Sequence, residues 1–249
     1  MSPEYLETRR KRMLAFHKIQ GTEPTVVFLG GFKSEMAGTK ALHLEDWAKR
    51  NGHSFLRFDY SGHGVSSGFF SDGCIGDWAE DAEEILNRTT TGRFILVGSS
   101  MGGWISCLMA KRMPERIAAL VTIAAAPDFT EDGFWSSFSD QQKSEVMDKG
   151  ITFLPSDYGD PYPITRRLIE DGRDHLILRS PFPVDFPVRM LQGDLDQSVT
   201  RETALRLFDH MDGNDIHLSF IKGGDHSLSS PENLKVLENH LETLIAFLE

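Results

Sequence analysis

The chain alternates between short apolar runs and longer segments in which apolar residues recur every three or four positions. The apolar runs lie at residues 26–29, 55–60, 94–97, 118–124, 188–191 and 217–221. Several are almost wholly apolar, which is typical of strands buried on both faces. The helical spacing occurs at residues 40–50, 75–87, 104–112, 200–209 and 232–248. This alternation predicts an α/β protein with a mostly parallel central sheet and helices on both of its faces.

The alternation fails between residues 128 and 185, a segment rich in proline and aromatic residues. Its aromatic residues include Phe129, Phe134, Trp135, Phe138, Phe153, Tyr158, Tyr162 and Phe182. An irregular loop of this length is uncommon in a compact domain. We therefore expect an inserted cap at residues 128–185, with helices near residues 140–148 and 164–171. Residues 1–127 and 186–249 would form the core.

Composition narrows the class of protein. A chain of 249 residues with 40% hydrophobic content can bury one sizeable core. The net charge of −11 disfavours nucleic acid and anionic membrane surfaces as partners. No apolar run is long enough to span a bilayer, and residues 1–18 mix acidic and basic side chains without a signal-peptide core. We expect a cytoplasmic protein.

The cysteines and histidines suggest neither a disulfide framework nor a metal site. The only cysteines are Cys74 and Cys107, which form no C-x-x-C pair and favour a reducing compartment. The nine histidines show no spacing typical of metal ligands. We expect no metal and no cofactor.

Residues 98–102 read G-S-S-M-G and lie between a strand-like run and a helix-like run. This is the setting of a nucleophile elbow, with Ser100 as the nucleophile. Glycine is needed on both flanks because a Cβ there would strike neighbouring backbone. The N–H of Met101, at the start of the helix, would form half of an oxyanion hole. Residues 64–68 match the same pattern, but no helical run begins at Ser66, so the context favours Ser100.

A serine nucleophile needs a general base and a carboxylate that orients the base, in the chain order Ser, acid, His. Asp194 and Asp196 both follow the strand-like run at residues 188–191, at the sheet edge where α/β proteins gather their ligand sites. We prefer Asp196 because it is farther from the strand, which leaves Asp194 as a turn residue.

His226 is the best candidate for the base. It follows the last strand-like run and a flexible pair of glycines, so its loop can bring the imidazole to the sheet edge. His63 is a rival, but it precedes Ser100 in the chain. We expect His63 to shape a loop beside the site.

The second oxyanion donor is expected from the loop after the strand at residues 26–29. The sequence there is Gly30-Gly31-Phe32, and the N–H of Phe32 would be paired with that of Met101. Alternatively, Gly30 and Gly31 only end the strand.

These residues together resemble the α/β-hydrolase superfamily. The resemblance rests on Leu29-Gly30-Gly31-Phe32, Asp59-Tyr60-Ser61-Gly62-His63-Gly64-Val65-Ser66, residues 98–102, the Asp196 segment and His226. More closely, Gly38-Thr39-Lys40-Ala41-Leu42, Arg57-Phe58-Asp59-Tyr60-Ser61-Gly62 and the run from Val97 to Trp104 are similar to the subfamily of mitochondrial palmitoyl-protein thioesterases that also cleave acyl glucuronides. The resemblance covers essentially the whole chain and implies hydrolase chemistry.

We therefore expect Ser100 to attack a small-molecule carboxylic ester or thioester, with His226 transferring the proton and Asp196 fixing the imidazole. Two alternatives stay open at this point. Carbon–carbon bond hydrolysis or acyl transfer would use the same triad. A non-catalytic binding module on this scaffold usually loses a triad member, and here all three candidates are present.

The substrate pocket is the least defined part of the site. Candidate lining residues are Gly31, Trp104, Phe134, Trp135, Phe138 and Phe153. Aromatic side chains of a small insertion can equally form its own core. Four arginines of the insertion, Arg166, Arg167, Arg173 and Arg179, could meet a substrate carboxylate or simply lie on a solvated helix face.

Overall fold

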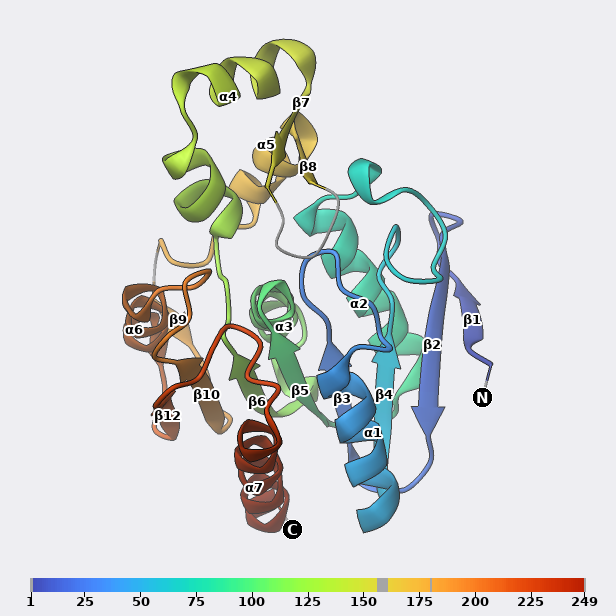
Figure 1. Ribbon diagram of the computed structural model, residues 1–249. Coiled ribbons are helices and arrows are strands. Elements are labelled where there is room, and N and C mark those ends of the chain that lie inside the picture. The colour runs from blue at the N-terminus through green and yellow to red at the C-terminus, as the bar shows by residue number, and fades with distance from the viewer. Residues whose placement is uncertain (1, 156–160, 180, 249) are drawn as a thin grey trace.

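The fold is built on an eight-stranded sheet with strand order β1-β2-β4-β3-β5-β6-β10-β12. The computed structural model describes residues 2–155, 161–179 and 181–248. The strands are β1 (Glu4–Glu7), β2 (Met13–Ile19), β3 (Thr22–Leu29), β4 (His53–Phe58), β5 (Phe94–Ser99), β6 (Ile117–Ile123), β10 (Val188–Gly193) and β12 (Ile216–Ile221). Strands β4, β3, β5, β6, β10 and β12 are parallel, and β1 and β2 are antiparallel to their neighbours (Figure 1). The mostly parallel sheet predicted from the sequence is confirmed.

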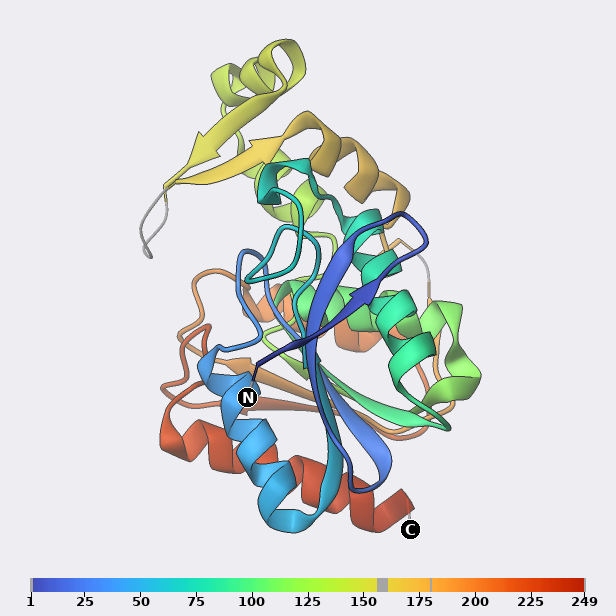
Figure 2. The same ribbon diagram turned by 90° about the vertical axis from the view of Figure 1, so that its right-hand side faces the viewer.

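Helices cover both faces of the sheet. Helices α1 (Thr39–Asn51) and α7 (Pro231–Leu248) cover one face, and α2 (Ile75–Thr89), α3 (Met101–Arg112) and α6 (Arg201–His210) cover the other (Figures 1 and 2). Side chains alternate along β3, so Val26 packs with the first set of helices and Val27 with the second. Within the described ranges, no helix is long and apolar enough to cross a membrane.

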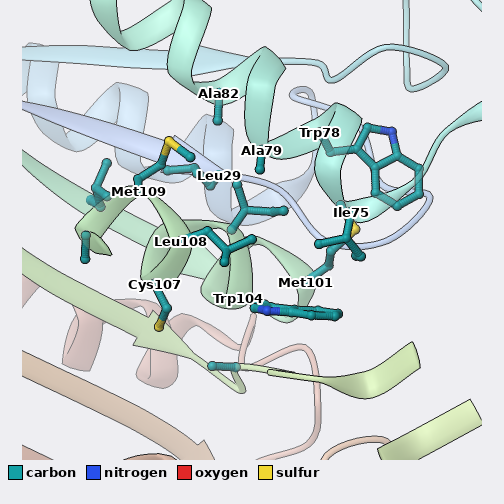
Figure 3. Close-up of a cluster of buried hydrophobic side chains, with 14 of the residues drawn as sticks. Leu29, Ile75, Trp78, Ala79, Ala82, Met101, Trp104, Cys107, Leu108 and Met109 are labelled. Carbon is teal, nitrogen blue, oxygen red and sulfur yellow. The ribbon is translucent and has the colours of Figure 1, made fainter. Parts of the chain in front are cut away.

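The packing of α2 against α3 fixes the start of α3. Trp78, Ala79 and Ala82 of α2 lie over the cluster that contains Leu29 and Leu108 (Figure 3). Burying one large apolar side chain contributes roughly 1.5–3 kcal/mol. The first turn of α3, which directly follows Ser100, is therefore held by the main core.

Two parts of the chain differ from the sequence-based expectation. The β1-β2 hairpin was not predicted, because β1 has only four residues, two of them glutamates, and the charged residues 9–12 separate it from β2. In the insertion, the expected helix over residues 140–148 is a short α4 (Asp140–Ser144) followed by a π-helical turn (Glu145–Lys149). Tyr158 lies outside the described residues.

The expected helix at residues 164–171 begins later than predicted. Ile164 belongs to β8 (Tyr162–Thr165), which pairs with β7 (Ile151–Leu154) as a hairpin, and α5 runs over Arg166–Asp174. The Thr165 hydroxyl accepts a hydrogen bond from the N–H of Leu168 and so defines the start of α5. A further π-helical segment, Phe129–Trp135, was also not predicted.

The insertion rises between β6 and β10, beyond the carboxyl ends of the parallel strands (Figures 1 and 2). Asp128 joins its two ends. The carboxylate accepts hydrogen bonds from the N–H groups of Ile177 (2.7 Å) and Leu178 (2.9 Å). The Asp128 side chain is 0% exposed, and this burial raises its pKa although the two N–H donors favour the charged form. These hydrogen bonds hold together the two chain segments that connect the core with the insertion.

We predict that Asp128→Asn lowers the free energy of unfolding by about 3 kcal/mol, because the amide group presents a donor to one of the two buried N–H groups. Urea unfolding measures the effect. The matched control is Asp209→Asn on the exposed side of α6, where a change under about 0.5 kcal/mol is expected. Equal losses in the two variants would contradict this role of Asp128.

Candidate active site

Ser100 forms a sharp turn between β5 and α3. Its backbone has φ 55° and ψ −118°, a left-handed conformation that non-glycine residues rarely adopt. The Ser100 N–H donates to the carbonyl of Ile123 (2.9 Å), and its own carbonyl accepts from Gly103 and Ala126 (2.9 and 3.0 Å). Such strain, on the order of 1–3 kcal/mol, persists only where the surroundings impose it. The surrounding backbone therefore fixes the direction of the serine side chain.

The glycines on either side of Ser100 are sterically required. A Cβ on Gly98 would lie 2.3 Å from the carbonyl oxygen of Gly102, and a Cβ on Gly102 would lie 2.1 Å from that of Leu29. Both distances are far below van der Waals contact. The expected reason for the two glycines agrees with the geometry of this turn.

Ser66, in the second G-x-S-x-G match, has a different environment. Its hydroxyl donates to the carbonyl of Asp59 (2.7 Å) and accepts from the N–H of Ala15 (2.8 Å). Both bonds join backbone segments, so this serine ties the loop after β4 to β2.

Ser100, His226 and Asp196 form a hydrogen-bonded chain. The Nε2 of His226 lies 3.1 Å from the Ser100 hydroxyl, and its Nδ1 lies 2.8 Å from an Asp196 carboxylate oxygen. The Asp196 side chain is 0% exposed, whereas that of His226 is 30% exposed. The order and spacing are those of a nucleophile, its base and the group that orients the base.

Asp196 is held as a carboxylate. One oxygen accepts from the N–H groups of Ser198 (2.8 Å) and Val199 (2.9 Å), and the other from the side-chain amide of Gln192 (2.9 Å). Burial alone would raise the pKa of Asp196, but the hydrogen bonds from His226 and the backbone outweigh it and lower the pKa. Gln192, the next-to-last residue of β10, was missed in the sequence because buried glutamine has no distinctive spacing.

Asp194 points to a different set of partners. Its carboxylate accepts from the Lys222 ammonium and from the N–H of Gly223, both at 2.6 Å. It therefore links the ends of β10 and β12, whereas Asp196 faces His226.

Two backbone N–H groups lie beside the serine. Met101 is the first residue of α3, where N–H groups have no partner within the helix. A Cβ on Gly31 would lie 3.4 Å from the Cβ of Ser100, so the loop that carries Phe32 passes directly along the serine. Within the residues the structure covers, neither Phe32 nor Met101 donates its N–H to a protein acceptor. This arrangement can receive a negatively charged oxygen.

The ring of Phe32 is the centre of an aromatic cluster. Its neighbours, with ring centroids at 4.7 to 5.9 Å, are Phe70, Trp78, Phe129, Phe134 and Tyr162. Phe129, Phe134 and Tyr162 come from the insertion, and the other two come from the core. The insertion therefore contacts a residue of the loop that passes along Ser100.

The structure separates the pocket candidates into those near Phe32 and those away from it. Phe134 contacts Phe32, and Trp104 contacts Phe129 at 5.5 Å and donates to the carbonyl of His175 (3.0 Å). Phe138 is buried and stacks on Phe134.

The remaining two candidates have other environments. Trp135 lies beneath the cations of Lys143 and Arg173, and Phe153 is 59% exposed. Phe70 and Trp78 were not predicted as pocket residues. Trp78 has the helical spacing of a core residue, and Phe70 begins a short 3₁₀ helix (Phe70–Asp72).

The four arginines of the insertion each have a carboxylate partner on this chain. The pairs are Arg166–Glu170, Arg167–Asp77, Arg173–Glu131 and Arg179–Asp132, at 2.6 to 2.7 Å. Their charge is therefore matched internally, which favours a structural role over binding of a substrate carboxylate.

Comparison with known proteins identifies the family. The family described as the alpha/beta hydrolase fold matches this sequence over residues 24–163. Human mitochondrial palmitoyl-protein thioesterase ABHD10 is 35% identical over 234 residues, which are 93% of this chain and 76% of the relative. Among solved structures, a putative hydrolase from Agrobacterium vitis has a TM-score of 0.94 at 35% identity, over 98% of both chains. Alpha/beta hydrolase domain-containing protein 10 from mouse has a TM-score of 0.92 at 33% identity, over 100% of both chains. This chain therefore belongs to the α/β-hydrolase fold family.

Proposed function

We propose that this protein is a serine hydrolase that cleaves carboxylic ester or thioester bonds through an acyl-enzyme on Ser100. The observation that carries the proposal is the hydrogen-bonded chain from Ser100 through His226 to Asp196. The thioesterase names of relatives that are 35% identical support the same bond type.

In the acylation step, the Ser100 hydroxyl attacks the substrate carbonyl while His226 Nε2 takes its proton. The carbonyl oxygen becomes an alkoxide, which the N–H groups of Phe32 and Met101 stabilise. Losing one comparable donor costs on the order of 3 kcal/mol in other serine hydrolases. His226 then returns the proton to the departing alcohol or thiol, and the acyl group remains on Ser100.

In the deacylation step, water attacks the acyl-enzyme and gives one proton to His226. The same two N–H groups stabilise the second alkoxide. Collapse of this intermediate releases the carboxylic acid, and the proton on His226 returns to the Ser100 oxygen. Throughout both steps Asp196 stays ionised, holds the Nδ1–H tautomer of His226 and stabilises the imidazolium.

We propose that residues 128–185 act as a lid over this site and that residues 1–127 and 186–249 form the catalytic core. The aromatic contacts between the insertion and Phe32 support the lid, since they put apolar surface beside the reacting serine. An apolar acyl group fits such a wall.

The cytoplasmic location expected above stays a prediction, because the relatives are mitochondrial by name.

We predict that Ser100→Ala lowers kcat by at least about 10⁴-fold, because no nucleophile remains. The assay is a ladder of p-nitrophenyl esters from short to long acyl chains, beside a palmitoyl thioester. Ser66→Ala, in the other G-x-S-x-G match, is the control and should keep most of kcat. A folded wild-type protein that turns over no member of the ladder would move the function to carbon–carbon hydrolysis, acyl transfer or binding.

A pair of aspartate variants identifies the triad acid. Asp196→Asn should lower kcat by about 10⁴-fold, as expected when the wrong imidazole tautomer faces the serine. Asp194→Asn loses its ion pair with Lys222 but leaves His226 untouched, so its kcat should stay within about threefold of wild type. The two rates are measured on the best ester of the ladder. The reverse ranking would assign the acid to Asp194.

A further inference from the structure

His63 is a buried histidine that the proposed reaction does not use. It is only 3% exposed, and both ring nitrogens are engaged. Nε2 accepts a hydrogen bond from the N–H of Lys33 (3.2 Å), and Nδ1 donates to the carbonyl of Ser61 (3.2 Å). A carbonyl can only accept, so the bonds define a neutral ring with its proton on Nδ1. Burial also lowers the pKa of His63 to about 4, which keeps the ring neutral at pH 7.

The loop that carries His63 is rigidly held. Gly62 and Gly64 both have positive φ, and a Cβ on Gly64 would lie 2.1 Å from the Asp59 carboxylate. That carboxylate accepts from the N–H of Met36 (2.6 Å) as well as from Val65 (3.0 Å). The loop after β4 therefore binds the loop after β3 at two points. Asp59 accepts a hydrogen bond from the N–H of Met36, and His63 accepts one from the N–H of Lys33.

His63 and Phe32 also share two neighbours. The His63 ring lies edge-on to Phe70 (5.2 Å) and Trp78 (5.1 Å). The same two rings contact Phe32 at 4.7 and 5.9 Å. Phe32 is thus constrained on its side-chain face by these rings and along its backbone by the bond to the next residue.

We propose that His63 is a positioning residue that aims the Phe32 N–H at the substrate oxyanion, by accepting the N–H of Lys33. The peptide plane between Gly31 and Phe32 carries this donor, with Ser100 beside Gly31 and His63 bonded one residue farther on. This inference rests on the proposed function, since it needs an oxyanion at Ser100. It assigns His63 no contact with the substrate.

The first test compares His63→Leu, which removes the acceptor, with His63→Gln, whose side-chain oxygen can replace it. His63→Leu should lower kcat by about 10- to 100-fold with KM changed less than threefold, because a small misplacement of a donor costs rate rather than ground-state binding. His63→Gln should recover at least a third of the loss on a logarithmic scale. His240→Leu on α7, at a histidine that is partly buried, is the control and should keep kcat.

The second test measures a trifluoromethyl ketone inhibitor, which forms a hemiketal oxyanion on the serine. In His63→Leu its inhibition constant should rise by the same factor as kcat/KM falls, whereas inhibition by the carboxylic acid product should not change. Parallel loss of both affinities, or unchanged kcat with unchanged ketone inhibition, would overturn the positioning role.

The third test does not depend on catalysis or on a variant that folds. In wild-type protein labelled with ¹⁵N-histidine, the NMR spectrum at pH 7 should show the His63 ring with protonated Nδ1 and unprotonated Nε2. A proton on Nε2 would exclude the bond from Lys33 and overturn the inference even if Ser100 is the nucleophile. If the wild type shows the expected tautomer but no turnover that depends on Ser100, the proposed function is refuted, and the oxyanion role of His63 is refuted with it.

Discussion

The close approach of α3 to the end of β3 is the constraint on which the site depends. A Cβ on Gly102 would meet the carbonyl oxygens of both Leu29 and Gly30, at 2.1 and 2.6 Å. Helix and strand can therefore touch only without a side chain at this position. This contact brings the first turn of α3 and the loop after β3 together on either side of Ser100. The strained turn at Ser100 and the passage of Gly31 alongside it both depend on this one backbone packing.

A second set of contacts attaches the insertion to the core, between α5 and the start of α2. The Asp171 carboxylate accepts from the N–H of Gly76 at the start of α2 (2.7 Å), and Arg167 pairs with Asp77 (2.6 Å). Helix α5 is thereby fixed to α2, near Trp78 and its contact with Phe32. The aromatic cluster consequently joins three parts of the molecule, which are the insertion, α2 and the loop after β3.

The sequence predicted the parts of the fold that are governed by one simple periodicity. The six parallel strands and the five large helices were visible because each carries apolar residues in a run or at a regular spacing, most of them buried and those of β12 half-buried. The β1-β2 hairpin was not visible, since its charged side chains pair with α2, as Arg12 does with Asp77 and Asp81. For the candidate site, motif and chain order predicted Ser100 and His226, which the structure places within 3.1 Å of each other. The preference for Asp196 over Asp194 rested on distance from the strand alone, because the partners of each aspartate depend on the course of the turn after β10, which spacing does not contain.

The aromatic cluster around Phe32 could not be predicted because its residues come from segments that meet only in three dimensions. Phe134 and Phe153 are equally apolar, yet one contacts Phe32 and the other is exposed. The alternation of side chains along a strand explains why Phe153 is exposed. Phe153 follows the buried Thr152 in β7, so its side chain points to the other face of the hairpin. Which aromatic residues contact Phe32 thus depends on the direction each side chain takes, and composition alone cannot supply that direction.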